Sequence, residues 1–172
     1  MANVLRDKVV LIGMPGSGKT TIGKVLAKEL SYNFYDMDIY IEKKNKRKIK
    51  DIFNDGEDCF RKLETEACRD LSLKKRAIIS SGGGVVTRKE NIEILKKDCI
   101  IIFIDRPTED IVGDVDIESR PLLKDGRDKI YKLYEDRYNL YVDACDVVIK
   151  NNEFLRDAVN EMLRYLKNKI KE

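Results

Sequence analysis

The chain has 172 residues, and its 34 basic and 31 acidic side chains leave a formal net charge of +3. This length suits one domain, residues 1–172, with a substantial core, and the interspersed charges give little reason to expect a nucleic-acid or membrane surface. The sequence contains no histidine, which excludes Ser-His-Asp catalysis, Cys-His catalysis and histidine-ligated metal sites. Any chemistry must come from carboxylates, basic groups, backbone amides and a bound ion.

Short apolar segments alternate with helical patterns along the chain. The apolar segments are too short for buried helices and are rich in β-branched residues, which predicts strands. These strands are residues 9–12, 33–35, 77–79, 99–104 and 147–149. The helical patterns are residues 20–30, 49–53, 59–73, 89–96, 128–144 and 155–170. Such alternation favours an α/β fold, in which a parallel sheet has helices on both faces and ligands beyond the carboxyl ends of the strands.

The first strand and the first helix enclose a glycine-rich loop. Residues 13–20 read Gly-Met-Pro-Gly-Ser-Gly-Lys-Thr, which is a P-loop in its strand-turn-helix setting. The glycines let N–H groups turn toward phosphate, Lys19 adds a positive charge, and Thr20 supplies a hydroxyl for Mg²⁺. A glycine-rich turn that merely opens a helix is the alternative, but the strand before it and the amphipathic stripe after it disfavour that interpretation. The loop therefore predicts a bound nucleoside triphosphate, contacted by Gly16, Ser17, Gly18, Lys19 and Thr20.

Two acids follow the second predicted strand. Asp36 and Asp38 are two residues apart, so both carboxylates would point to the same side of an extended chain. There they can share a cation and accept the proton of an attacking alcohol. The alternative is that they only cap the helix that follows. We favour the catalytic interpretation because this strand end should lie close to the P-loop.

Three consecutive glycines, Gly82, Gly83 and Gly84, follow the third predicted strand. Because they lack Cβ atoms, they let a ligand approach the main chain, although a flexible turn is the alternative. We favour contact with a substrate because this position again lies at the carboxyl edge of the sheet.

Two arginines lie on or beside apolar helix faces. Arg137 shares the face of Ile130 and Tyr134, and an inward arginine requires an anion, either an internal carboxylate or the acid group of a substrate. Arg61 lies beside another apolar stripe, with Glu64 one turn later to orient it. Two guanidinium groups that converge on one carboxylate would suit a small anionic metabolite.

A polar stretch without clear periodicity spans about residues 112–126 and contains Arg120. Long connections in compact domains are often active-site lids. In a kinase, closure of such a lid would expel water that competes with the alcohol for the phosphoryl group.

The basic cluster between residues 43 and 50 has no alternating aromatic residues, so we interpret it as a solvated face rather than a nucleic-acid site. The four cysteines lack CxxC spacing, and the sequence shows neither an apolar signal segment nor an apolar run of bilayer length. We therefore expect a reduced, cytoplasmic monomer without a nucleic-acid or membrane partner.

Taken in order, these segments resemble the shikimate kinase family of P-loop small-molecule kinases. The residues that carry the resemblance are 13–21, 36–38, 52–53, 56–57, 60–64, 82–84 and 120–123, and Arg137 with Tyr141. The resemblance implies a three-layer sandwich with a five-stranded parallel sheet and a mobile lid. It also implies ATP and Mg²⁺ as ligands, and phosphoryl transfer to the 3-hydroxyl of shikimate in aromatic amino-acid biosynthesis.

The resemblance implies roles at the nucleotide. Lys19 would hold the β- and γ-phosphates, and the nucleotide-binding residues would extend to Thr21. Thr20 would ligate Mg²⁺, with Asp36 near the ion through water. Arg120 would move in with the lid and neutralise the charge of the transferring phosphoryl group.

The resemblance also implies roles at the second substrate. Asp38 would grip the substrate hydroxyls and accept the proton. Arg61, Arg137 and the Gly83 amide would bind the substrate.

Two other functions stay open. A kinase for another polyol acid, such as gluconate, shares the fold and needs a carboxylate clamp as well. A nucleotide-binding module without catalysis is the second alternative. The predicted lid carries Asp114, Asp116 and Glu118 where family members often have basic residues, which predicts looser ATP binding with the transfer chemistry intact.

Overall fold

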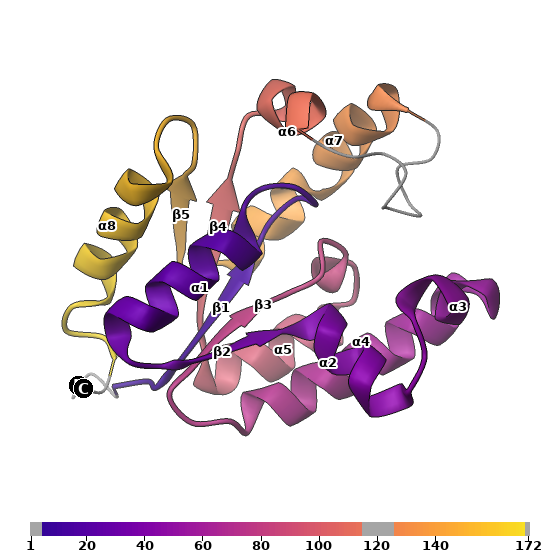
Figure 1. The fold of residues 1–172 in the computed structure, drawn as a ribbon, viewed down its shortest axis with the longest axis horizontal. Coiled ribbons are helices and arrows are strands. Elements are labelled where there is room, and N and C mark those ends of the chain that lie inside the picture. The colour runs from indigo at the N-terminus through magenta and orange to yellow at the C-terminus, as the bar shows by residue number, and fades with distance from the viewer. Residues whose placement is uncertain (1–4, 115–125, 171–172) are drawn as a thin grey trace.

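A computed structural model describes residues 5–114 and 126–170 (Figure 1). Its sheet has five strands in the order β2-β3-β1-β4-β5, and every pairing is parallel. The strands are β1 (Lys8–Ile12), β2 (Asn33–Asp36), β3 (Ala77–Ser80), β4 (Ile100–Asp105) and β5 (Val147–Lys150). The predicted five-stranded parallel sheet is confirmed, and each strand begins and ends within one residue of its prediction.

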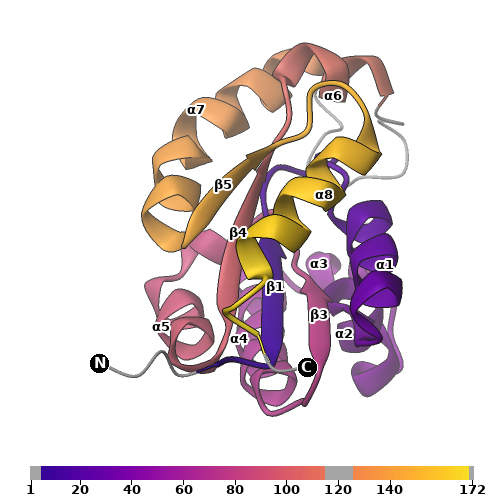
Figure 2. The same ribbon diagram turned by 90° about the vertical axis from the view of Figure 1, so that its left-hand side faces the viewer.

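Helices cover both faces of the sheet (Figures 1 and 2). The helices are α1 (Lys19–Leu30), α2 (Met37–Asn45), α3 (Ile49–Asn54), α4 (Glu57–Ser72), α5 (Lys89–Asp98), α6 (Thr108–Asp114), α7 (Arg127–Ala144) and α8 (Leu155–Leu166), with a 3-10 turn η1 (Val85–Thr87). Figure 2 shows α1 and α8 on one face, with α4, α5 and α7 on the other. The predicted three-layer α/β sandwich is thus confirmed.

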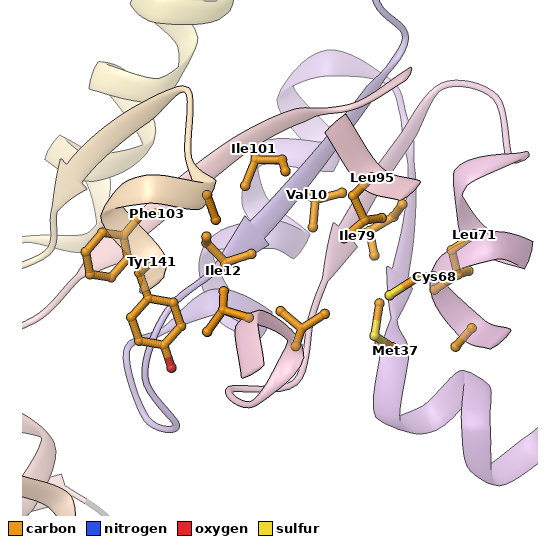
Figure 3. Close-up of a cluster of buried hydrophobic side chains, with 14 of the residues drawn as sticks. Val10, Ile12, Met37, Cys68, Leu71, Ile79, Leu95, Ile101, Phe103 and Tyr141 are labelled. Atoms are coloured by element: carbon orange, nitrogen blue, oxygen red, sulfur yellow. The ribbon is translucent and has the colours of Figure 1, made fainter. Parts of the chain in front are cut away.

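Side chains of β1 alternate between two apolar cores. Val9 and Leu11 pack with α1 and α8, whereas Val10 and Ile12 face α4, α5 and α7. In the second core, the ring of Phe103 on β4 stacks on Tyr141 of α7, with ring centroids 5.0 Å apart (Figure 3). All of these side chains are fully buried, so the central strand is fixed from both faces.

Three helix predictions were wrong or incomplete. The predicted helices omit α2 and α6, in which few residues are buried and the apolar stripe is correspondingly weak. The helix predicted to end at residue 170 ends at Leu166, because Ile170 forms an isolated parallel bridge with Arg6 instead.

The predicted lid overlaps α6. Residues 112–114 are helical rather than irregular, while residues 115–125 lie outside the described residues. Across 5–114 and 126–170, no helix has both the length and the apolar character needed to cross a bilayer.

Candidate active site

The ends of three strands meet at one edge of the sheet. Asp36 at the end of β2 is in register with Ser80 at the end of β3, and Ser80 is in register with Leu11 of β1. The loop after β1 leaves between β3 on one side and β4 on the other. Ligands of open parallel sheets bind at such a change in strand order, so a ligand site is expected at this edge of the sheet.

The P-loop after β1 has a backbone that requires glycine. Gly13, Gly16 and Gly18 have φ angles of 146°, 82° and 98°. A Cβ on Gly13 would lie 2.5 Å from the carbonyl oxygen of Ile104, so a side chain there is excluded by distance as well. Lys19 is buried, and its Nζ donates hydrogen bonds to the carbonyl oxygens of Gly13 at 2.9 Å and Met14 at 2.7 Å.

Two side chains from distant strand ends hold P-loop carbonyls. Asn151, just after β5, donates from Nδ2 to the Ser17 carbonyl oxygen at 2.9 Å. Arg106, just after β4, donates from Nη1 to the Gly16 carbonyl oxygen at 3.0 Å. In a trans peptide the C=O and the following N–H point in opposite directions. By fixing the Ser17 carbonyl, Asn151 therefore also fixes the direction of the Gly18 N–H.

Arg106 also pairs with Asp114 at the end of α6. One of the acids expected to make the lid unfavourable for ATP is therefore neutralised by an arginine that contacts the P-loop. Sequence reasoning missed both Arg106 and Asn151, although their positions just beyond strands pointed to this edge of the sheet.

A hydroxyl and a carboxylate meet beside the P-loop. The Thr20 hydroxyl donates to Asp36 Oδ2 at 3.0 Å and lies 3.2 Å from the Ser80 hydroxyl, which the sequence analysis did not single out. Hydroxyl and carboxylate oxygens are ligands that suit Mg²⁺, which usually keeps several waters and also binds substrate phosphates. In the described part of the chain, no three His, Cys, Asp or Glu side chains converge to hold a metal by themselves. The donors present therefore fit an ion that arrives with a nucleotide.

The expected geometry of the two acids was wrong. Asp36 is extended, with φ −94° and ψ 122°, but Asp38 lies in the first turn of α2, so strand alternation does not align their carboxylates. Asp36 caps α2 by accepting hydrogen bonds from the backbone N–H groups of Asp38 at 3.0 Å and Ile39 at 3.2 Å. The Asp36 carboxylate thus both caps α2 and accepts the hydrogen bond from Thr20.

The second half of the site is a buried cluster around Arg61 on α4. Arg61 Nη1 donates to Glu64 Oε2 at 2.9 Å, and Nη2 donates to Glu57 Oε1 at 2.9 Å. Arg61 is 5% exposed and Glu64 is fully buried. Burial raises the pKa of the Glu64 carboxyl, while the adjacent Arg61 guanidinium acts in the opposite direction.

The three glycines after β3 connect this cluster with Asp38 and the P-loop. A Cβ on Gly84 would lie 2.3 Å from Arg61 Nη1, and one on Gly83 would lie 2.7 Å from Cδ of Pro15. A Cβ on Gly82 would lie 2.9 Å from Glu64 Oε1 and 3.3 Å from Asp38 Oδ1. These glycines are therefore required by close approach rather than by a flexible turn.

Two buried polar atoms of this cluster lack hydrogen-bond partners among the residues that the structure describes. They are Glu64 Oε1 and Arg137 Nη1. Arg137 is 7% exposed and forms no ion pair within residues 5–114 and 126–170, so an internal carboxylate is not its partner there. An unpartnered buried guanidinium nitrogen is costly, and an anionic ligand would remove that cost.

The predicted site residues thus form two adjoining groups. The nucleotide group contains Gly16, Ser17, Gly18, Lys19, Thr20 and Asp36, with Thr21 exposed on the first turn of α1. The second group lines what we call the acid pocket, and it contains Asp38, Arg61, Gly82, Gly83, Gly84 and Arg137. Arg120 lies outside the described residues.

Comparisons with known proteins agree on one family. A family model described as "Shikimate kinase" matches residues 15–167. A shikimate kinase of Clostridium beijerinckii is 56% identical over 158 residues, which cover 92% of this chain and 94% of the relative. A shikimate kinase of Clostridium botulinum strain Alaska E43 is 44% identical over 164 residues, which cover 95% of this chain and 99% of the relative.

Solved structures give the same result. The chain resembles the shikimate kinase of Acinetobacter baumannii solved in complex with shikimate, with a TM-score of 0.90 and 32% identity over 98% of this chain and 97% of the other. A gluconokinase from Sinorhizobium meliloti is similar with a TM-score of 0.60 and 12% identity, over 95% of this chain and 94% of the other. At that identity the likeness shows the fold alone.

The hydrogen bond from Asn151 to the P-loop generates a prediction. Asn151→Ala removes one neutral hydrogen bond, so we expect the Kd for Mg-ADP to rise about fivefold by calorimetry. Asn152→Ala, a substitution of the exposed neighbouring residue, is the matched control and should leave Kd unchanged. An Asn151→Ala protein that binds Mg-ADP as tightly as the parent would show that the hydrogen bond to the Ser17 carbonyl does not contribute to nucleotide binding.

Proposed function

The chain belongs to the shikimate kinase family, and from this membership we propose that it transfers the terminal phosphoryl group of ATP to the 3-hydroxyl of shikimate. The products are shikimate 3-phosphate and ADP. One observation supports this acid substrate above all: within residues 5–114 and 126–170, the buried Nη1 of Arg137 has no hydrogen-bond partner. A small alcohol with a carboxylate would supply the missing anion and would present a hydroxyl near the phosphates.

At the nucleotide, the proposed contacts come from the P-loop and the end of β2. The backbone N–H groups of residues 16–21 cradle the phosphates, and the Lys19 ammonium exchanges its carbonyl partners for the β- and γ-phosphates. Thr20 and Asp36, which are hydrogen-bonded to each other, would hold Mg²⁺. When bound, the ion screens the charge of the phosphates.

At the acceptor, Asp38 is the proposed base. The substrate 3-hydroxyl oxygen forms a bond to the γ-phosphorus as the bond from that phosphorus to the β–γ bridging oxygen breaks, and the hydroxyl proton passes to the Asp38 carboxylate. Arg61 and Arg137 bind the substrate carboxylate, and the amides of Gly82, Gly83 and Gly84 line the pocket. Arg120 is proposed, on its sequence motif alone, to neutralise the transferring group.

We also propose that one chain forms a complete site and works as a cytoplasmic monomer. Both groups of site residues come from the same chain, and all four cysteines are free thiols, as a reducing compartment would leave them.

A coupled assay of ADP release tests the reaction. With ATP and Mg²⁺, we expect ADP production that depends on shikimate, with little or none on gluconate, because the chain belongs to the shikimate kinase family. Lys19→Ala, which removes the phosphate-binding ammonium, should abolish the signal. Turnover with gluconate alone would favour the other polyol acid. Nucleotide binding without turnover on either acid would favour a module without catalysis.

Asp38→Asn tests the base. The amide cannot accept the proton, so we expect kcat to fall about 10²- to 10⁴-fold, while the Kd for Mg-ADP stays at the parent value because the P-loop is untouched. Single-turnover kinetics and calorimetry on the same preparations separate the two quantities. Unchanged turnover would remove Asp38 from this role.

Arg137→Ala tests the carboxylate clamp. Loss of a charged hydrogen bond should raise the KM for shikimate at least tenfold, with a smaller effect on the KM for ATP. If Arg137 serves the fold instead, the variant will show a lower melting temperature together with parental KM values.

A further inference from the structure

Glu57, the first residue of α4, forms an ion pair with Arg61 of the acid pocket. Both Nε and Nη2 of Arg61 donate hydrogen bonds to Oε1 of Glu57, at 3.2 and 2.9 Å. The side chain of Arg61 is 6% exposed, whereas that of Glu57 is 56% exposed. A carboxylate that reaches in from the surface thus occupies one edge of the buried guanidinium group to which the proposed function assigns the substrate carboxylate.

The rest of the Arg61 guanidinium faces protein groups. Its Nη1 donates to Oε2 of Glu64 at 2.9 Å. A Cβ on Gly84 would lie 2.3 Å from both Nη1 and Nη2, so the end of the guanidinium lies against the main chain of the glycine loop. A guanidinium group donates in fixed directions within its plane. Within residues 5–114 and 126–170, the edge formed by Nε and Nη2 is therefore the one that suits a ligand carboxylate, and Glu57 occupies it.

The two carboxylates on Arg61 differ in how readily they can leave. Glu64 is fully buried, so its departure would break a buried ion pair at high cost. Glu57 is mostly exposed, and exposed ion pairs four residues apart on a helix contribute little to stability. Glu57 also lies in the first turn of α4, where the helix dipole favours an anion whether or not that anion touches Arg61. Glu57 can therefore release Arg61 at small cost, and Glu64 cannot.

We propose that Glu57 is a specificity-determining residue that occupies the substrate-carboxylate position on Arg61 in the empty pocket and is displaced when an acid binds. The exchange replaces one carboxylate by another, so the buried guanidinium is never left without an anion. This inference rests on the proposed function, because that function places the substrate carboxylate at Arg61. A neutral ligand carries no group that can displace Glu57, so Glu57 affects the affinity for acids alone.

A different role for Glu57 predicts the opposite result. If Glu57 orients Arg61 for the substrate, removal of its charge will weaken the binding of the acid. If Glu57 competes with the substrate, the same change will strengthen it. The sign of the effect therefore distinguishes the two roles.

Glu57→Gln keeps the size of the side chain and removes its charge. We expect the Kd for shikimate to fall about fivefold by calorimetry, because a neutral amide competes for Arg61 less strongly than a carboxylate. The Kd for the methyl ester of shikimate, which has no carboxylate, should stay at the parental value. The Kd for Mg-ADP should also be parental, since the hydrogen bonds of Glu57 go to Arg61 and not to the P-loop.

Asp58→Asn is the matched control. Asp58 is the next residue of the same turn, with its side chain 68% exposed, and it pairs with Lys62 at 3.1 Å and with Arg88 instead of Arg61. The control removes the same charge from the same part of the surface. It should leave the Kd for shikimate at the parental value.

The outcomes separate this inference from the proposed function. An unchanged or higher Kd for shikimate in Glu57→Gln would overturn the displacement. An equal fall in Asp58→Asn, or an equal fall for the acid and its ester in Glu57→Gln, would also overturn it, because the effect would then come from surface charge or pocket shape. If the parent turns over shikimate, the proposed function stands in each of these cases. If the parent neither binds nor turns over shikimate, the proposed function fails, and the displacement fails with it.

Discussion

An anion site built from main-chain amides depends on the orientation of peptide planes. Each N–H that faces the anion belongs to a peptide whose carbonyl must be kept on the other side. Glycines allow these turns, but the same freedom means that glycine loops do not hold their own peptides. In this chain the carbonyls are held from outside, by Asn151 at Ser17, Arg106 at Gly16 and Tyr141 at Gly83.

The strand order explains why side chains from these elements reach the loop carbonyls. β1 carries the P-loop from the middle of the sheet, with β3 and its glycine loop on one side and β4 and β5 on the other. The residues just beyond β4 and β5 therefore reach the P-loop, and α7, which packs against the same face as α4 and α5, reaches the glycine loop. Parallel strands with helical crossovers thus bring these side chains and the glycine-rich loops together at one edge of the sheet.

The sequence predicted the glycine-rich loops but few of the side chains that donate hydrogen bonds to their carbonyls, and the reason is physical. The P-loop, the glycine run and the inward face of Arg137 are local patterns, which a short window of sequence reveals. By contrast, Asn151 and Ser17 are 134 residues apart, and Tyr141 and Gly83 are 58 apart. No local periodicity records such contacts. The helical setting of Asp38 was missed for a different, local reason: the Asp36 carboxylate caps α2, so the extended backbone stops at Asp36 and does not continue to Asp38.

The two arginines of the acid pocket differ in their partners, which bears on the ligands that the pocket accepts. Arg61 is paired with two carboxylates, the buried Glu64 and the exposed Glu57, at 2.9 Å each, so its charge is already matched by protein groups. Arg137 is also buried, but among residues 5–114 and 126–170 it forms no ion pair and its Nη1 has no hydrogen-bond partner. A ligand carboxylate at Arg137 would supply the missing anion, whereas a neutral polyol of the same shape would leave the guanidinium without one, at a cost of at least about 1–3 kcal/mol. The pocket therefore favours an acid over a neutral polyol through Arg137 rather than through Arg61.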